Sequence, residues 1–504
     1  MDRNSRHQDD YEDGNLFGMK KITYWEKYGV KRFPYRGKRT FTPLLYQSLD
    51  GRMVISNDVY GLTISQFEQT YKACLERRKT HEQRILNIRY PDKSSNEYLE
   101  YLENCTESNT DNLLWAGNEP REKYVYEHLV KIVGTEIDIR KRQRLFIITD
   151  MITNKCVFLN TIITSGSLAE GLQLPDSDLD IMIVIGNVDV LQNERNIKYP
   201  IHCTTLIMET DIDHPGFTRL RTVAANVGES IVVLGADEKH YVSVNSFIDS
   251  HKKMCKIPFS LHGPCLSDEE QTHDFAFCLW SRYLPHNMMP WASRRRRQWP
   301  SNFVIDSIIN YGCLLVPIGP KTLSYTDKLW RLSFSLAEKI LVHSFNFTQL
   351  ICYGLLKLTL KRIVNKKDHV RDLLCSYFLK TSLFWVSEEV DIDTFQLPNL
   401  FKCFFLCLNK LKAWIINCYC PNYFIPEHNM FLGKITPYNN KLLLSVIDSI
   451  QFDGIVGLMN NLFPPEKKML SVTMFKQGTF INYARFPILQ DLHVICYFRY
   501  FTFL

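Results

Sequence analysis

The stretch Ser165-Gly-Ser-Leu-Ala-Glu-Gly-Leu-Gln-Leu-Pro-Asp-Ser-Asp-Leu-Asp-Ile-Met-Ile-Val-Ile185 decides the fold expected for this chain. It places a Gly-Ser turn ahead of two carboxylates, Asp178 and Asp180, which stand at the head of an apolar strand. Side chains alternate along a strand, so these carboxylates share one face while Leu179 and Ile181 point to the other. Two like charges are costly to bury unpaired, and a hard divalent cation bound through oxygen removes that cost. The pattern therefore predicts a metal site.

The Gly-Ser turn supplies the complement to this site. Gly166 leaves the turn free of Cβ crowding, and Ser167 adds a hydroxyl beside backbone N–H groups that can face an anion. A helix beginning at Leu168 would add partial positive charge for a phosphate. A phosphate cradle beside two metal-binding carboxylates predicts metal-assisted nucleotidyl transfer from a triphosphate.

A plainer interpretation of the same stretch is an Asp-rich turn before a strand. Asp176 and Asp178 would then close the turn, and Gly166-Ser167 would be an ordinary bend. Asp180 argues against this interpretation because it lies inside the strand pattern. Asp274 heads a second apolar stretch and is a candidate third metal ligand that also activates the attacking hydroxyl, although by itself such a residue equally suits the turn at a strand end.

Composition sets broad limits on the class of protein. The chain has 504 residues, 45% of them hydrophobic, and its 60 Lys and Arg against 54 Asp and Glu give a net charge of only +6. The N-terminus shows no apolar signal region, so the fifteen cysteines are expected to be reduced thiols in a cytoplasmic protein. No run approaches the roughly 20 apolar residues that a membrane span needs, so no membrane partner is expected.

The pattern of elements changes along the chain and predicts an α+β protein. Residues 1–18 are polar and expected to be disordered, and 19–120 read as an N-terminal extension of short helices and loops. Residues 121–300 form a mixed α/β catalytic lobe and 301–435 an all-helical lobe, followed by a poorly specified tail over 436–504.

Helical periodicity supports this division. A long helix is expected from Glu122, with apolar positions recurring every three or four residues, and it would run straight toward the Gly-Ser turn. After residue 300, three apolar stripes over 330–341, 353–363 and 404–415 predict further helices.

Two basic clusters are candidates for binding nucleic-acid phosphates. One comprises Arg140, Lys141, Arg142 and Arg144 on the expected long helix, and the other is the run Arg294–Arg297. Each is equally explained as a solvated helix face or loop.

A cysteine cluster offers a weaker metal candidate. Cys403 and Cys407 lie one helical turn apart, with Cys418, Cys420 and His428 downstream. Buried thiols on amphipathic helices explain this spacing better than a zinc site does.

Residues of about 120 to 435 resemble the male-abnormal-21 superfamily, which includes the cyclic GMP-AMP synthase-like receptors. The Gly-Ser turn with Asp178-Leu-Asp180 is similar to the family's nucleotidyltransferase signature, and Asp274 falls where the family places its third carboxylate. The segments Trp330–Lys339, Cys375–Thr381 and Asn422–Phe431 resemble its later signatures.

The resemblance implies a role for individual positions. The nucleotide-binding residues would be Gly166, Ser167, Arg331, Ser333, Ser335, Lys357, Ser376 and Tyr377. The arginine and the two serines after it would lie near the acceptor nucleotide, Lys357 would reach the donor phosphates, and Ser376 and Tyr377 would hold the donor base. The helix with Arg140 to Arg144 would form part of a ligand-sensing surface.

The implied protein is a two-lobed nucleotidyltransferase that makes a cyclic dinucleotide from ATP and GTP in innate immune signalling. Two Mg²⁺ or Mn²⁺ ions would be held by Asp178, Asp180 and Asp274. No zinc ribbon is expected, because Val342–Cys352 runs on directly where the DNA-sensing synthase has its insertion. Double-stranded RNA is therefore a better candidate activator than double-stranded DNA.

Two other functions compete with this one. A catalytically silent scaffold would be favoured by loss of a carboxylate or of the Gly-Ser turn, and the sequence keeps both. An RNA-tailing nucleotidyltransferase would share the catalytic lobe, but the signatures from Trp330 onward argue against it.

Overall fold

The computed structural model describes residues 119–156, 160–174, 177–197, 199, 201–224, 232–254, 260–268, 272–320 and 327–464, with two earlier strands. These strands, β1 (Leu44–Gln47) and β2 (Met53–Ser56), pair antiparallel within a first compact unit, Met1–Leu86. The second unit, Asn87–Leu504, contains all the elements discussed below. The expectations for 1–18, for nearly all of 19–120 and for 465–504 lie outside the described residues.

The second unit is built on a twelve-stranded sheet among the described residues. Its strands are β3 (Thr161–Ser165), β4 (Leu179–Val184), β5 (Val188–Leu191), β6 (Thr204–Thr210), β7 (Phe217–Ala224), β8 (Val232–Leu234), β9 (His240–Val242), β10 (Ser260–His262), β11 (Cys265–Ser267), β12 (His273–Ser281), β13 (Cys313–Val316) and β14 (Trp330–Ser333). The main path runs β10-β11-β12-β13-β14-β7-β6-β5, and β4 joins β12 in parallel with β3 antiparallel to β4.

Strand β4 shows the alternation that the sequence predicts. Ile181 and Ile183 belong to the main core, whereas Met182 and Val184 join a second apolar cluster with residues of β12 and β13. Because both faces of β4 are buried beyond its first two residues, only the start of the strand can hold carboxylates without burying them completely.

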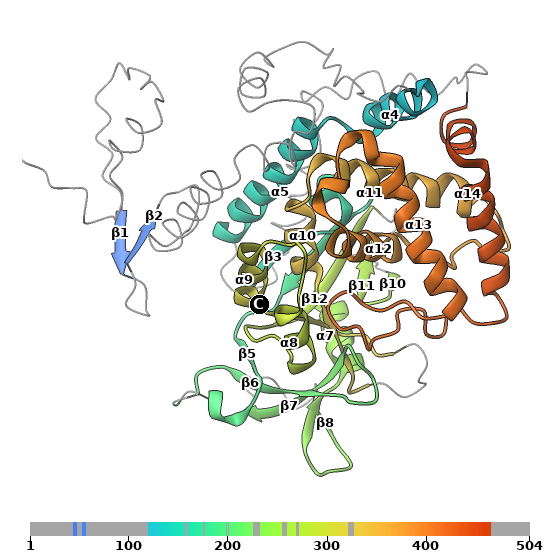
Figure 1. Cartoon of the computed structure of the whole chain (residues 1–504). Helices are drawn as coiled ribbons and strands as arrows, with labels where there is room; N and C mark the ends of the chain where they lie inside the picture. Colours follow the sequence, from blue (N-terminus) through green and yellow to red (C-terminus); the bar gives the residue numbers. More distant parts are fainter. Residues whose placement is uncertain are drawn as a thin grey trace, which may run out of the picture. The chain divides into compact units, whose positions relative to one another are not determined.

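Helices surround the sheet and form a separate group after β14. They are α4 (Pro120–Val133), α5 (Glu136–Cys156), α6 (Gly166–Ala169), α7 (Val244–Met254), α8 (Met289–Ser293), α9 (Asn302–Tyr311), α10 (Ser335–His343), α11 (Phe347–Thr359), α12 (Ser376–Glu389), α13 (Leu400–Asn417) and α14 (Asn440–Leu462). Figure 1 shows α11 to α14 gathered on one side of the sheet. Contacts join α4 to both α11 and α14.

The single long helix expected from Glu122 is two helices. The chain breaks at Gly134, whose φ of 103° lies outside the range that a helix uses, and α5 begins at Glu136. Strand β3 then stands between α5 and the Gly-Ser turn, so the helix does not run directly into the turn.

The boundary between the sheet and the C-terminal helices lies later in the chain than the expected residue 300. Trp330 lies in β14, with its indole N–H donating to the carbonyl of Val242, and α10 begins only at Ser335. The helical stripe predicted from Trp330 is therefore wrong at its start, where a short strand completes the sheet. The mixed α+β class is confirmed, with a sheet core and a C-terminal helical domain.

The stripe predicted over 404–415 is confirmed. Phe404, Leu408, Leu411 and Ile415 lie on one face of α13 and are buried against the neighbouring helices. Because α13 contacts α11, α12 and α14, this face belongs to the core of the helical domain. The apolar spacing in the sequence therefore predicted these core residues correctly.

Helix α14 departs from the expectation that no run is long and apolar enough to span a membrane. By length and composition it passes that test, with a mean hydropathy of 1.6, as the one such helix among the described residues. One face packs on α13 and α4 through residues that include Leu443, Val446 and Ile447. Gly454, with φ 55°, kinks it near its middle.

Candidate metal and nucleotide site

Three carboxylates meet at the start of β4. The parallel register of β4 and β12 places Asp180 directly opposite Asp274, and Asp178 immediately precedes β4. One carboxylate oxygen from each residue lies within 4.8 Å of the other two. The hydroxyl of Ser267 in β11 donates a hydrogen bond to Asp274 and orients that carboxylate. Among the described residues, these three side chains form the one group of Asp, Glu, His or Cys whose ligand atoms lie close enough together to hold a metal ion.

The three carboxylates repel one another, and a bound cation would relieve this repulsion. Burial, together with the charges of Asp178 and Asp274, raises the pKa of Asp180 from 3.8 to about 7. Burial and the nearby charge of Asp274 likewise raise the pKa of the Cys265 thiol to about 12. A divalent cation bound by the carboxylate oxygens would reverse this repulsion and keep all three carboxylates ionised.

The Gly-Ser turn lies against the cluster. Ser165, the last residue of β3, pairs with Asp180, and the next residue, Gly166, has φ 68°. A Cβ atom at Gly166 would lie 1.7 Å from Oδ2 of Asp180. Glycine is therefore required twice, by its backbone conformation and by the carboxylate beside it.

The geometry of this turn corrects one expectation. The helical turn α6 begins at Gly166, not at Leu168. A valine side chain at Gly166 would collide with Asp180 and disturb the carboxylate cluster. The glycine thus serves the metal site as well as any phosphate.

Two of the predicted nucleotide-binding cations are unpaired. Arg331 in β14 and Lys357 in α11 make no hydrogen bond or ion pair within the described part of the chain, although both are largely buried. Burial lowers the pKa of both groups, and the charges of Asp178 and Asp180 act in the opposite direction on Lys357. Lys357 lies over the ring of Tyr353, at 5.8 Å from its centroid. Buried cations without a hydrogen-bond or ion-pair partner are costly, so an anionic ligand bound near them would offset that cost.

The remaining predicted nucleotide-binding residues flank these cations. Ser333 donates to Ser335 across the junction of β14 and α10, at 3.3 Å between the two oxygens. Ser376 and Tyr377 form the first turn of α12, and the Asn422 side chain donates to the hydroxyl of Tyr377 at 3.2 Å. Burial raises the pKa of Tyr377, so it remains a neutral aromatic ring. Their roles toward a nucleotide stay predictions.

The proposed sensing cluster on α5 is divided between structural and exposed residues. Arg140 donates to two backbone carbonyls at and just beyond the end of α10, and Arg142 donates to the carbonyl of Gly171 and to the end of α4. Lys141 and Arg144 are exposed. Arg140 and Arg142 therefore serve the fold, and the sensing surface that the sequence suggests is reduced to its two exposed members.

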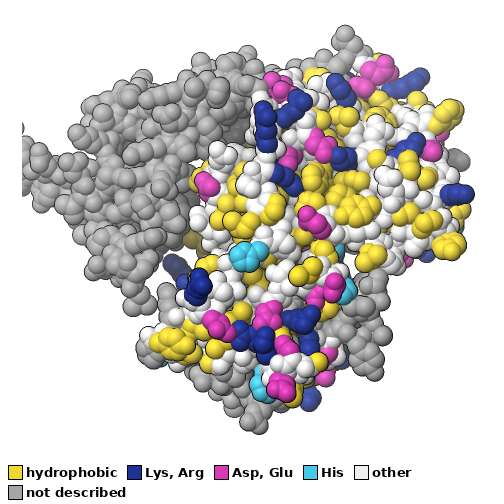
Figure 2. Space-filling view, turned by 60° about the horizontal axis from the view of Figure 1, so that its bottom comes forward, with side chains coloured by type: hydrophobic (Ala, Val, Ile, Leu, Met, Phe, Trp, Pro, Cys, Tyr) yellow, Lys and Arg dark blue, Asp and Glu magenta, His cyan; other side chains and the backbone are white. Residues whose placement is uncertain are grey.

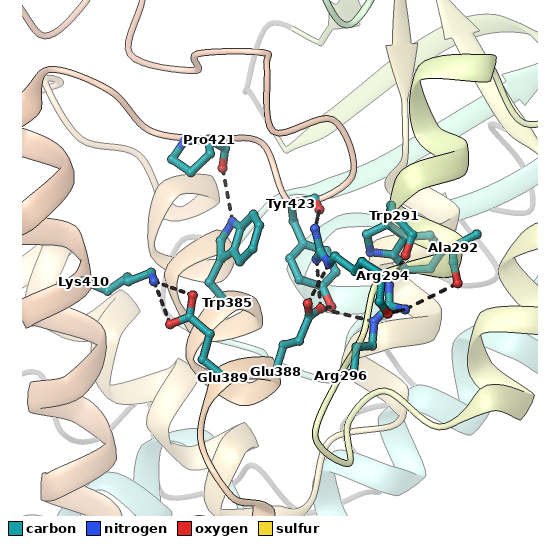
Figure 3. A network of polar contacts seen from close by, with 10 residues as sticks. All are labelled: Trp291, Ala292, Arg294, Arg296, Trp385, Glu388, Glu389, Lys410, Pro421 and Tyr423. Carbon is teal, nitrogen blue, oxygen red and sulfur yellow. Dashed lines mark hydrogen bonds and ion pairs between the residues drawn. The ribbon is translucent and has the colours of Figure 1, made fainter.

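The run Arg294–Arg297 is divided in the same way. Figure 3 shows Arg294 and Arg296 converging on Glu388 of α12, with N–O distances of 2.6 and 3.3 Å. The hydroxyl of Tyr423 donates to the same carboxylate, and the Arg294 guanidinium lies over the Trp385 ring. Arg295 and Arg297 are exposed. Two of the four guanidinium groups thus hold this loop to the helical domain.

Other charges do not gather into one basic surface on the face that Figure 2 shows. Lys and Arg side chains alternate there with Asp and Glu. Ion pairs on the sheet match this view, since Arg219 pairs with Asp211 at 3.0 Å and Arg221 with Glu209 at 2.7 Å.

The His side chain at the end of α10 and the Cys side chains in α11 and α13 lie in surroundings unlike those of zinc ligands. His343 donates to the carbonyl of Ala169 at 2.9 Å, and burial lowers its pKa to about 4. Cys403 and Cys407 are buried free thiols in α13, as the thiol interpretation predicts, and Cys352 is a buried free thiol in α11.

Sequence reasoning missed a set of buried ion pairs around the site. Lys339 pairs with Asp150 of α5, and Lys380 of α12 pairs with both Glu170 and Glu338. The only indication of these ion pairs in the sequence was the pair of charged residues, Glu338 and Lys339, at the end of the Trp330–Lys339 segment. Its partners could not be assigned because they lie far away in the sequence.

The fold and the site define a mixed α+β protein with an acidic cluster on its sheet and a C-terminal helical domain. Residues 350–449 match the family model of the Mab-21 protein HhH/H2TH-like domain. These residues therefore resemble that helical domain, and the resemblance to the male-abnormal-21 superfamily is confirmed.

Individual relatives agree with this assignment at a distance. The chain is 28% identical to cyclic GMP-AMP synthase of Mus musculus over 159 residues, which cover 28% of this chain and 29% of the relative. It is 29% identical to that of Sus scrofa over 183 residues (33% and 36%), and 24% identical to the cyclic GMP-AMP synthase-like receptor of Aethina tumida over 149 residues (29% and 35%). The matched part spans about a third of the length of each relative.

Proposed function

We propose that this protein is a metal-dependent nucleotidyltransferase of the cyclic GMP-AMP synthase-like receptor type, with the two-lobed fold of such enzymes. The observation that carries the proposal is the carboxylate cluster of Asp178, Asp180 and Asp274, with Gly166 packed against it. The distant similarity to cyclic GMP-AMP synthases supports it.

The donor set fits two Mg²⁺ or Mn²⁺ ions, since such hard ions prefer carboxylate oxygens. Asp178, Asp180 and Asp274 would hold them. When bound, the ions would supply Lewis-acid activation of a ribose hydroxyl and charge stabilisation at the α-phosphorus. The raised pKa of Asp180 supports this assignment, because a bound cation would offset the repulsion among the three carboxylates.

The chain's own residues would bind and orient two nucleoside triphosphates, ATP and GTP. Lys357 would contact the donor phosphates, and Arg331 with its neighbouring serines would contact the acceptor. Tyr377 offers a neutral aromatic face for the donor base. The two unpaired cations support this arrangement, because an anionic ligand would remove the cost of burying them.

The activator would be a double-stranded RNA bound in the cytoplasm, and the product would serve innate immune signalling. Lys141 and Arg144 of α5 are the exposed members of the candidate sensing surface. Arg295 and Arg297 are a second exposed pair that a duplex could contact. The division of both basic clusters supports testing these four residues rather than whole clusters.

The proposal is tested by incubating the purified full-length chain with labelled ATP, GTP and Mg²⁺ or Mn²⁺, with and without double-stranded RNA or DNA. A cyclic dinucleotide is the expected product, detected by chromatography and mass spectrometry. Asp274→Asn should abolish it, whereas Asp306→Asn, at an exposed position of α9, should not. If neither duplex nor Mn²⁺ elicits any product and no triphosphate binds, the catalytically silent scaffold is the better description.

A further inference from the structure

A buried bridge of three charges lies behind the candidate site. The Lys380 ammonium is 2.7 Å from Oε1 of Glu170 and 2.7 Å from Oε2 of Glu338. None of the three side chains is more than 9% exposed. Lys380 lies in α12, Glu338 in α10 and Glu170 at the end of α6, so the bridge joins three elements.

The bridge holds its lysine charged. Burial alone would lower the pKa of Lys380, but the carboxylates of Glu170 and Glu338 outweigh it and raise the pKa. Two carboxylates already neutralise this ammonium, so it is not a free phosphate ligand. In contrast, Lys357 one helix away has no ion pair among the described residues.

Glu170 is attached to the Gly-Ser turn through the backbone. Its N–H donates to the carbonyl of Gly166 at 3.1 Å and closes the single helical turn that begins there. From the other side, the Gln143 side chain of α5 donates to the Glu170 carbonyl at 2.8 Å. The backbone of Glu170 is therefore tied to the residue packed against Asp180, while its side chain is tied to α10 and α12.

The same bridge touches the predicted donor site at two further points. Lys380 stands one helical turn after Ser376, on the helix expected to hold the donor base. The Glu170 charge favours the protonated form of Lys357, against the effect of burial. A side-chain hydrogen bond also couples Glu170 to Tyr353 of α11, the helix that carries Lys357.

We propose that Glu170, held by Lys380 and Glu338, is a positioning residue that keeps the Gly-Ser turn in register with α11 and α12, so that one donor triphosphate contacts all three. This inference rests on the proposed function. It assigns a task to residues that would not touch the nucleotide. Loosening the bridge should displace the phosphate cradle relative to α11 and α12, and should therefore weaken donor binding more than it destabilises the fold.

The test compares Glu170→Gln with a matched change elsewhere on α12. Glutamine has nearly the same shape and can still accept from Lys380, so the variant should fold. Glu388→Gln is the control, because Glu388 is also a buried acceptor on α12 that neutralises two cations but lies in the Arg294 network (Figure 3). Affinity for a non-hydrolysable ATP analogue with Mn²⁺ is measured by calorimetry, with KM, kcat and thermal stability on the same samples.

Glu170→Gln should weaken binding of the ATP analogue by at least about tenfold, which corresponds to about 1.4 kcal/mol of binding free energy. The KM for the donor should rise by a similar factor. Glu388→Gln should lower the melting temperature at least as much as Glu170→Gln does. Its affinity for the analogue and its KM should equal those of the wild type. Lys380→Met should raise KM as well, and the double variant with Glu170→Gln should be no worse than the more severe single change, because both break one bridge.

Unchanged affinity and KM in Glu170→Gln would overturn the inference and leave the proposed function standing. An equal rise of KM in Glu388→Gln would also overturn it, because general loosening would then explain the effect. If the wild-type chain binds no triphosphate with Mn²⁺, the proposed function and this inference fail together.

Discussion

Replacing Asp180 by asparagine should stabilise the metal-free protein while abolishing its response to metal. The change removes the carboxylate whose ionisation the fold opposes most, since burial and the charges of Asp178 and Asp274 raise its pKa from 3.8 to about 7. A shift of that size corresponds to a cost of about 4 kcal/mol for holding the group ionised in the folded chain. The side chain keeps some contact with water, so we expect the uncharged amide to recover about half of this cost, ~2 kcal/mol.

The pH dependence follows from the sign of the shift. Between pH 3.8 and about 7 the folded chain binds more protons at this site than the unfolded chain does, so the stability of the metal-free wild type falls as pH rises through that window. The advantage of Asp180→Asn should therefore be small near pH 4, grow toward pH 7 and stay constant above it.

Thermal unfolding in EDTA and in Mn²⁺ checks this directly. At pH 8 the variant should melt a few degrees above the wild type in EDTA, and Mn²⁺ should raise the melting temperature of the wild type alone. The exposed Asp306→Asn should change neither. A lower melting temperature for Asp180→Asn in EDTA, or a retained Mn²⁺ response, would refute the account of three mutually repelling carboxylates.

Three other outcomes are expected. Metal affinity of the wild type should fall about tenfold per pH unit below pH 7, because one proton must leave for the ion to bind; a flat profile by calorimetry would contradict this. Gly166→Ala should abolish synthesis and Mn²⁺ stabilisation together, because its Cβ would overlap the Asp180 carboxylate, and a variant that still responds to Mn²⁺ would show that the turn can move. Lys141→Glu with Arg144→Glu should flatten the salt dependence of duplex binding and remove activation, with Arg295→Glu and Arg297→Glu as the competing pair; activation lost only in the second pair would move the sensor away from α5.

Much of the site could be anticipated from local pattern. Asp180 was recognisable because strand periodicity placed it on the face opposite Ile181, and that alternation holds in β4. The core face of α13 was equally visible, since helical spacing is also a local property. By contrast, Trp330 was misplaced in a helix. A four-residue strand gives too short a pattern to tell from the start of a helix, and its identity depends on pairing with β13 and β7.

The sequence by itself determined which residues carry charge at the head of β4 and where glycine precedes them. Only the tertiary structure decided what those charges meet. The opposition of Asp180 and Asp274 depends on a parallel pairing between distant strands, and the bridge of Lys380 to Glu170 joins residues 210 positions apart. The structure also decided that Arg140, Arg142, Arg294 and Arg296 hold the fold together. Sequence shows that a guanidinium is present, but its partner is set by packing, because the carbonyl or carboxylate that accepts from it can come from anywhere in the chain.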